Sequence, residues 1–194
     1  MQNGFIKIII RIGDENMELN EVLNKRKSTR RQYLSKKVDD NVIRQVIEAA
    51  ILAPSWKNSQ VTRYYIAKSK EALQQVKNAL PEFNQENVGQ APVLIVSTIV
   101  LNRSGYNKDG TPTNELGNGW GYYDCGMHNM NLLLKATELG LSTLVMGIRD
   151  EQKIKEIFAI PDNQSVVSVI ALGYSDMEIE RPQRKTFEDI TVMK

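Results

Sequence analysis

Cysteine and histidine are almost absent from this sequence of 194 residues, which holds one of each, Cys125 and His128. A single cysteine excludes an internal disulfide, and one histidine with no second ligand nearby provides no metal framework. We therefore expect no bound metal and a buried Cys125 that acts as a small hydrophobic residue. The low cysteine content also fits a reducing compartment, and we expect a cytoplasmic protein.

An excess of charge of either sign is missing as well. The 25 basic and 23 acidic residues give a net charge of +2, which is too balanced for nucleic acid or an anionic membrane to be the main partner. The apolar segment 5–12 is far too short to span a bilayer, and it lacks the small-residue cleavage site of a secretory signal. Any anion-binding site must therefore be local.

Repeats, low-complexity tracts and internal linkers are also absent, so the length predicts one domain. Met17 begins a segment that is typical of a protein start. We therefore expect residues 1–16 to be an N-terminal extension and residues 17–194 to form a single domain. With 41% hydrophobic and 25% charged residues, the composition is that of a globular chain that can bury a core.

Hydrophobic periodicity predicts helices and strands in an interleaved but irregular order. The expected helices cover 19–26, 40–51, 70–80 and 120–139, with a short one after position 150. The expected strands cover 61–67, 93–100, 144–148 and 166–172. This order, with no dinucleotide-binding fingerprint, favours an α+β sandwich of sheet and helices over a doubly wound parallel sheet.

Some elements carry more specific expectations. Good N-cap residues precede three of the helices, namely Asp39 with Asp40, Ser69 and Asp150. The β-branched run 93–100 predicts a central strand that is buried on both faces. The polar segment 102–119 is long enough to be a functional lid or a disordered loop. The residues expected on the inward face of the longest helix are Met127, Met130, Leu133, Leu134 and Thr137.

Two clusters of polar residues in the first third of the chain could carry chemistry. Arg26-Lys27-Ser28-Thr29-Arg30 offers guanidinium forks and hydroxyls that suit a phosphate, although such a run is more often a solvated helix end. The segment 53–60 follows an expected helix and has the composition of a polar turn. Its hydroxyl and amide groups would also suit the edge of a polar heterocycle.

Three further clusters are shorter, and each has an ordinary structural explanation. Asn84-Gln85 is expected to lie in a loop before the strand that begins near position 93. Met146-Gly147 falls in an expected strand, where a glycine marks either a close backbone approach to a ligand or a simple bulge. The segment 181–185 is a second basic cluster or a solvated tail.

The order and spacing of all these clusters resemble the nitroreductase family of FMN-dependent flavoproteins, which take hydride from NAD(P)H. The resemblance covers about 17–194. The matching segments are Arg26–Arg30, Pro54–Gln60, Asn84 before Ala91-Pro92, Asp124–Gly126, Gly140–Thr143, Met146-Gly147, Leu172–Tyr174 and Arg184-Lys185. One departure is Val61-Thr62, which follows Gln60 where the family commonly has Pro-Trp.

The resemblance implies a central, mostly antiparallel sheet flanked by helices, and a homodimer with the flavin at the subunit interface. It implies that Arg26, Ser28 and Arg184 hold the phosphate of FMN. Lys27 would lie nearby, and Lys185 is a further candidate for the same phosphate.

Other residues would contact the isoalloxazine ring. Arg30 and Asn84 would lie along its pyrimidine edge, and the backbone N–H groups of Met146 and Gly147 would face N5. The residues expected to come from the second subunit are Pro54, Ser55 and Asn58.

The implied activity is a ping-pong reaction, in which NADH or NADPH gives hydride to the flavin and a small electron-poor acceptor, such as a nitroaromatic or a quinone, then takes it. The flavin carries the chemistry, so no catalytic side chain is expected. Two alternatives stay open: a flavin enzyme of another reaction type on the same scaffold, and a non-catalytic flavin-binding or sensing protein. The bulky Trp56 could wall the acceptor pocket or bar the nicotinamide.

Overall fold

The computed structural model describes residues 17–194, and the expected extension 1–16 lies outside the described residues. At its centre is a four-stranded sheet of order β1-β2-β4-β3, in which each neighbouring pair of strands is antiparallel. The strands are β1 (Thr62–Ala67), β2 (Val93–Val100), β3 (Ser142–Met146) and β4 (Gln164–Gly173). The expected α+β class with a mostly antiparallel sheet is therefore confirmed.

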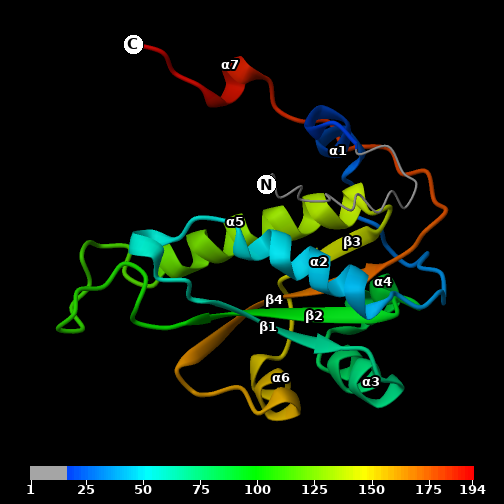
Figure 1. The fold of residues 1–194 in the computed structure, drawn as a ribbon, viewed down its shortest axis with the longest axis horizontal. Helices are drawn as coiled ribbons and strands as arrows, with labels where there is room; N and C mark the ends of the chain where they lie inside the picture. The colour runs from blue at the N-terminus through cyan, green and yellow to red at the C-terminus, as the bar shows by residue number, and fades with distance from the viewer. Residues whose placement is uncertain (1–16) are drawn as a thin grey trace, which may run out of the picture.

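Helices cover both faces of this sheet (Figure 1). On one face lie α2 (Asp40–Ile51) and α5 (Gly119–Glu138), and on the other lie α3 (Lys70–Asn78) and α6 (Glu151–Phe158). The shorter elements are α1 (Leu19–Lys25), η1 (Trp56–Asn58), α4 (Glu82–Val88) and α7 (Phe187–Ile190). Across residues 17–194, no helix is long and apolar enough to cross a membrane.

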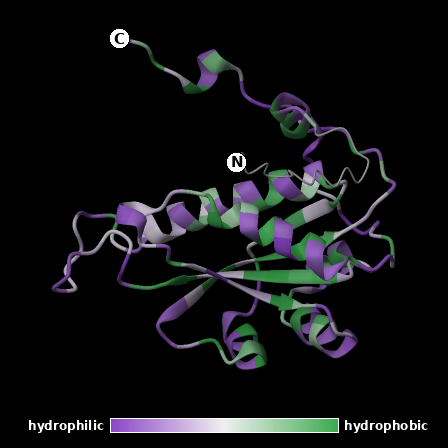
Figure 2. Ribbon diagram, viewed as in Figure 1, coloured by the Kyte–Doolittle hydropathy of each residue, from purple (hydrophilic) through white to green (hydrophobic). Residues whose placement is uncertain are grey.

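The central strands divide the hydrophobic core into two parts. Leu94 and Val96 of β2 pack with residues of α3 and α6, whereas Val93 and Ile95 pack with residues of α2 and α5. Full burial of such a side chain stabilises the fold by roughly 1.5–3 kcal/mol. Figure 2 shows this pattern: the central strands are mostly hydrophobic, and the covering helices alternate between hydrophobic and hydrophilic residues.

Three of the helices begin where their N-cap residues predict. The side chains of Asp39, Ser69 and Asp150 accept hydrogen bonds of 2.8, 3.1 and 3.1 Å from backbone N–H groups in the first turn of α2, α3 and α6. These bonds satisfy donors that a helix leaves without a partner. At its other end, α5 stops at Gly140, which has φ +72.

The segment after β4 leaves the layers and returns toward the start of the described chain (Figure 1). It passes α1, where the Arg181 guanidinium donates a hydrogen bond to the carbonyl oxygen of Leu23. Thr186 and Asp189 then form a capping box that starts α7. The second basic cluster therefore lies beside the first helix, although the two are far apart in the sequence.

Two expectations about secondary structure were wrong. Asn84 and Gln85 lie in α4 and not in a loop, because the chain becomes helical directly after Pro81. Gly147 and Ile148 lie beyond the last residue of β3, which pairs with β4 only as far as Met146. Gly147 is therefore neither a strand residue nor a bulge.

The expected inward face of α5 was also partly wrong. Leu133 is buried and Met130 is 46% exposed, while Met127, Leu134 and Thr137 are half-buried. The buried face instead carries polar residues that find partners in the sheet. Asn129, for example, accepts a hydrogen bond from the Tyr64 hydroxyl at 3.1 Å and donates one to Ser97 Oγ at 3.2 Å.

Gly89, at the end of α4, provides a test of how closely this helix end packs against the backbone of Arg31. It has φ +54 and ψ −120, and a Cβ there would lie 2.5 Å from the Arg31 carbonyl oxygen. We expect Gly89→Ala to lower the free energy of unfolding by about 2 kcal/mol, because the backbone is strained for alanine and the added carbon clashes. Chemical denaturation measures this change.

The matched control is Gly126→Ala in α5, where a Cβ meets no atom within 4 Å. Alanine favours a helix over glycine by about 1 kcal/mol, so this variant should be at least as stable as the wild type. A similar loss in both variants would contradict the steric explanation.

Candidate functional site

The first basic cluster runs beside the beginning of β3. Ser28 forms an isolated parallel bridge with Thr143, and the Thr29 N–H donates to the Thr143 carbonyl oxygen at 3.0 Å. The buried Tyr33 donates its hydroxyl to the Thr29 carbonyl oxygen at 3.1 Å. Lys27 lines a pocket of about 200 Å³ in the same place. The backbone of the cluster is thus fixed to the sheet, which gives its side chains defined positions.

Arginines from the two ends of the described chain lie near one another beside this segment. Burial lowers the pKa of the Arg26 guanidinium, and the nearby charges of Arg181 and Arg184 lower it further. Among residues 17–194, none of these three arginines has a carboxylate oxygen within 4 Å. Three like charges repel one another, and a bound anion would relieve that repulsion. Lys185 is exposed next to Arg184.

α4 connects the basic cluster with the residues that follow β3. The Arg31 N–H donates to the Asn87 carbonyl oxygen at 2.7 Å, and the Arg31 guanidinium pairs with Glu86 at 3.0 Å. On the same helix, the buried Asn84 donates its side-chain N–H to the Ile148 carbonyl oxygen at 3.2 Å. The structure therefore brings Arg26–Arg30, Asn84 and Met146-Gly147 together at the β3 edge of the sheet.

A buried carboxylate holds the turn Pro54–Gln60. Asp124, in α5, is 1% exposed. Both of its oxygens lie 3.1 Å from the Trp56 backbone N–H, and its Oδ2 accepts a hydrogen bond of 2.6 Å from the Ser104 hydroxyl. The carboxylate thereby joins the turn, the loop that contains Ser104 and the long helix.

The backbone of this turn is unusual. Lys57, Asn58 and Gln60 have φ values of +46, +54 and +48, which non-glycine residues adopt at an energetic cost. Ser55 Oγ accepts a hydrogen bond of 2.9 Å from the Gln60 N–H and so closes the turn. The buried Val61 follows, so the departure from the family pattern at this position leaves the turn formed.

The turn lies near the start of α5, whereas α1 and the segment after β4, to which the arginines belong or are adjacent, lie near its end (Figure 1). Asp124 is near the start of this helix, and the strand that contacts Ser28 follows its end. At 1.5 Å per residue, the helix rises about 20 Å from Asp124 to its last residue. Within one chain the structure therefore does not bring Pro54, Ser55 and Asn58 together with Arg26.

Aromatic rings pack at the same end of α5 as the turn. The ring centroids of Trp56 and Trp120 are 4.5 Å apart, and those of Trp120 and Tyr123 are 5.9 Å apart. The Trp120 indole N–H donates to Asn114 Oδ1 at 2.9 Å. The preceding loop, which could have been a lid or disordered, is thus a hydrogen-bonded segment that packs on the helix.

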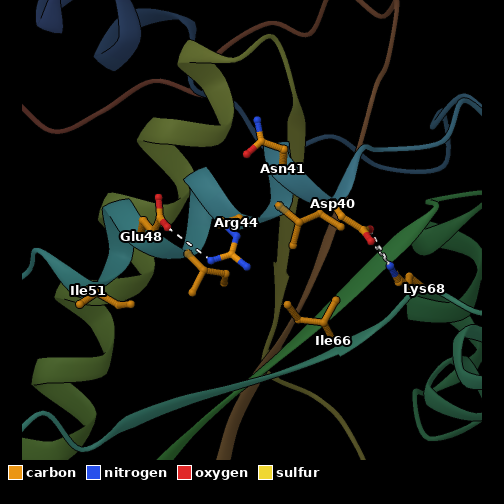
Figure 3. Close-up of a pocket in the computed structure, with 9 residues that line it drawn as sticks. Asp40, Asn41, Arg44, Glu48, Ile51, Ile66 and Lys68 are labelled. Carbon is orange, nitrogen blue, oxygen red and sulfur yellow. Dashed lines mark hydrogen bonds and ion pairs between the residues drawn. The ribbon is translucent and has the colours of Figure 1, made fainter.

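A larger pocket lies elsewhere. It has a volume of about 630 Å³, lies between α2 and the edge strand β1, and is shown in Figure 3. Lys68 pairs with Asp40 at 2.6 Å at its rim. Its floor is formed by Ile43, Ile47, Ile51 and Ile66. None of the predicted site residues lines this pocket.

Arg181 and Asp124 are candidates that sequence reasoning did not select. Arg181 belongs to the same basic run as Arg184, and only its position near Arg26 distinguishes it. Asp124 matches the family pattern but had no assigned role. Its contact with Trp56 joins residues 68 positions apart, and no local pattern shows such a contact.

Cys125 and His128 lie on the buried face of α5. Burial raises the pKa of the Cys125 thiol to about 11, and the expected role of this residue as a small buried group is confirmed. His128 Nδ1 lies 2.8 Å from the Asp124 carbonyl oxygen. Within the described part of the chain, no three potential metal ligands form a group.

Comparisons with known proteins show the family and the fold of this chain. A family model described as "Nitroreductase family" matches residues 23–87 and 74–174. An Archaeoglobus fulgidus protein named "Putative NADH dehydrogenase/NAD(P)H nitroreductase" is 27% identical over 148 residues, which cover 74% of this chain and 78% of that protein. A nitroreductase family protein from Clostridium novyi, whose crystal structure is known, is 28% identical in sequence. Its structure matches with a TM-score of 0.70, and the match covers 82% of this chain and 86% of that chain.

A further crystal structure shows similarity of fold. A Staphylococcus epidermidis protein named "putative NAD(P)H:FMN oxidoreductase" has a TM-score of 0.81 at 21% identity. The match covers 94% of this chain and 100% of that chain.

The burial of Cys125 gives a direct test of the packing around Asp124. With the thiol pKa near 11, about one thiol in a thousand is ionised at pH 8. We expect a thiol reagent to react at least about 100-fold more slowly with the native protein than with the unfolded chain. The unfolded chain should yield one reactive thiol per molecule. Rapid stoichiometric labelling of the native protein would contradict the structure.

Proposed function

This chain belongs to the nitroreductase family of oxidoreductases, and on that basis we propose that it is an FMN-dependent enzyme that transfers hydride from NADH or NADPH to a small electron-poor acceptor. The names of its relatives, a nitroreductase and an FMN oxidoreductase, support this proposal. The observation that carries it is the position of Arg181 and Arg184 near Arg26. Guanidinium groups from both ends of the described chain thereby provide a site for a phosphate.

The donors at this site suit the phosphate of FMN. A guanidinium fork matches two phosphate oxygens, and partial burial strengthens the attraction between Arg26 and an anion. Ser28 adds a hydroxyl on a backbone that is fixed to β3. We therefore assign phosphate binding to Arg26, Ser28 and Arg184, with Lys27 and Lys185 beside them.

The residues around Asn84 suit the edge of a flavin ring, which supplies the hydride-transfer chemistry when FMN is bound. Arg30 would provide positive charge where the pyrimidine edge becomes negative on reduction. Asn84 would face the same edge, and its bond to the Ile148 carbonyl also holds the chain just after Met146 and Gly147. Their backbone N–H groups would then be fixed as donors toward N5.

We propose that the turn Pro54–Gln60 serves the site of a second copy of the chain. About 20 Å of helix lies between the contact of Asp124 with the turn and the end of α5 nearest the arginines, so within one chain the turn lies far from the proposed phosphate site. A homodimer in which each turn reaches the partner's cofactor would bring Ser55 and Asn58 to the ring. This arrangement accounts for a site whose two parts lie at opposite ends of α5.

A non-catalytic flavin-binding protein is the second candidate, and the aromatic residues near the turn favour it. Trp56, Trp120 and the 62% exposed Tyr123 form a bulky group. If these rings cover the partner's flavin, they would exclude a nicotinamide while all phosphate contacts remain.

The absorption spectrum tests the proposal and separates the two candidates. The protein should purify yellow, or stay yellow after FMN is added and the unbound flavin is removed. NADH or NADPH should bleach it without oxygen, because the flavin takes the hydride, and a quinone or nitroaromatic should restore the colour. A protein that gains no FMN would refute the proposal. A yellow protein that neither nicotinamide bleaches would support the non-catalytic candidate.

Substitution of the arginines tests the phosphate site. Hydrogen bonds to charged groups contribute roughly 1.5–3 kcal/mol, so Arg26→Ala and Arg184→Ala should each weaken FMN binding by about 10- to 100-fold. Quenching of FMN fluorescence measures the dissociation constant. Lys70→Ala removes one exposed positive charge at the start of α3 and should leave the constant unchanged. Wild-type affinity in both arginine variants would show that the assignment is wrong.

A further inference from the structure

Asp124 is a buried charge that neither the phosphate site nor the flavin edge uses. Its carboxylate is 1% exposed, and among residues 17–194 it has no cationic group within 4 Å. Its oxygens accept hydrogen bonds only from neutral donors: the Trp56 N–H at 3.1 Å and the hydroxyls of Ser104 at 2.6 Å and Ser59 at 3.5 Å. A buried carboxylate is costly unless such bonds compensate for lost water.

Two of these donors belong to one strained turn. Trp56 and Ser59 flank Lys57 and Asn58, both of which have positive φ. A backbone in this conformation persists only where its surroundings hold it. The bonds from Asp124 are placed to do this, because they fix the residues on either side of the strained pair.

The Trp56 side chain does not provide an equivalent anchor. Its ring packs on Trp120, but its indole N–H is buried and has no hydrogen-bond partner among the described residues. The ring is therefore positioned by packing on Trp120 and by the Lys57 ammonium, 5.8 Å from its centroid, and Asp124 binds the backbone of the turn. Loss of the carboxylate would leave the bonds within the turn, such as that between Ser55 Oγ and the Gln60 N–H, but would remove the polar link between the turn and α5.

We propose that Asp124 is a positioning residue that shapes the turn Pro54–Gln60 for the cofactor site of the partner subunit. This inference rests on the proposed function, in which Ser55 and Asn58 of one chain border the flavin of the other. Asp124 itself touches neither flavin nor acceptor. Its loss impairs the partner's site and leaves the arginine cluster of its own chain intact.

Tryptophan fluorescence tests whether Asp124 holds the turn Pro54–Gln60 in place, and this test needs no flavin. The chain has two tryptophans, and both belong to the contact between the turn and α5. Asp124→Ala should change the emission spectrum and expose Lys57 to faster cleavage by trypsin. Asp124→Asn keeps an oxygen that can accept from the Trp56 N–H, and it should restore both properties. Asp162→Ala, which removes an exposed carboxylate before β4, is the matched control.

Enzyme activity tests whether the shape of the turn matters for the cofactor site. A displaced contact in an active site can reduce the rate by about 100-fold, so Asp124→Ala should lower kcat/KM by about 10- to 100-fold. Asp124→Asn should recover most of this loss. Wild-type emission, proteolysis and kcat/KM in the alanine variant would each overturn the inference.

A mixed dimer shows whether Asp124 acts on the partner. One subunit carries Asp124→Ala and the other carries Arg26→Ala, with different affinity tags for isolation. One of the two sites then combines an intact arginine cluster with an intact turn. We expect this dimer to bind one flavin and to have about half of the wild-type activity, although each parent is impaired. A mixed dimer as inactive as its parents would overturn the inference.

The two proposals fail in different ways. If the wild-type protein binds no FMN, the proposed function is wrong and the role of Asp124 toward a partner's cofactor is wrong with it. If the wild type binds FMN and transfers hydride but Asp124→Ala keeps wild-type emission, proteolysis and kcat/KM, the proposed function stands and the inference about Asp124 alone fails. A mixed dimer that recovers no activity would overturn the inference together with the proposed sharing of the turn between subunits.

Discussion

The pairing of β2 with β4 is the constraint on which the rest of the structure depends. Both strands are almost entirely buried, so their polar groups must find partners within the sheet and its faces are closed to ligands. The buried polar side chains of these strands are paired as well. Ser97 Oγ lies 2.8 Å from Ser168 Oγ, and the Thr98 hydroxyl donates to Gln164 Oε1 at 2.6 Å. Chemistry is therefore confined to the edges and ends of the layers.

The long helix α5 then sets the distance between the two groups of candidate residues. Its 20 residues form a rod of about 30 Å. One end holds the strained turn through a buried carboxylate, and the other leads through Gly140 to the strand beside the arginines. In the proposed function, each chain would contribute the arginines to one site and the turn to another. Two copies of the chain would provide two complete sites without any additional element.

Much of the fold could be predicted because its signals are local. Ser69 precedes its helix by one residue, and β2 carries a nearly continuous β-branched run. Features that depend on distant contacts could not be predicted. Asn84 lies in a short helix whose anchor is 64 residues away, and Met130 is exposed because polar residues beside it bond to the sheet. The order of motifs indicated the segments of the site, but Arg181 and Asp124 are distinguished only by their neighbours in space.

The separation of the two groups along α5 has a consequence for how the proposed dimer would keep its flavin. When two chains share one ligand, association of the chains and capture of the ligand are linked equilibria, and each favours the other by the same factor. Dilution that separates the subunits would release the flavin, and excess flavin would draw free subunits together. The fraction of flavin that stays bound to the protein would therefore report its quaternary state.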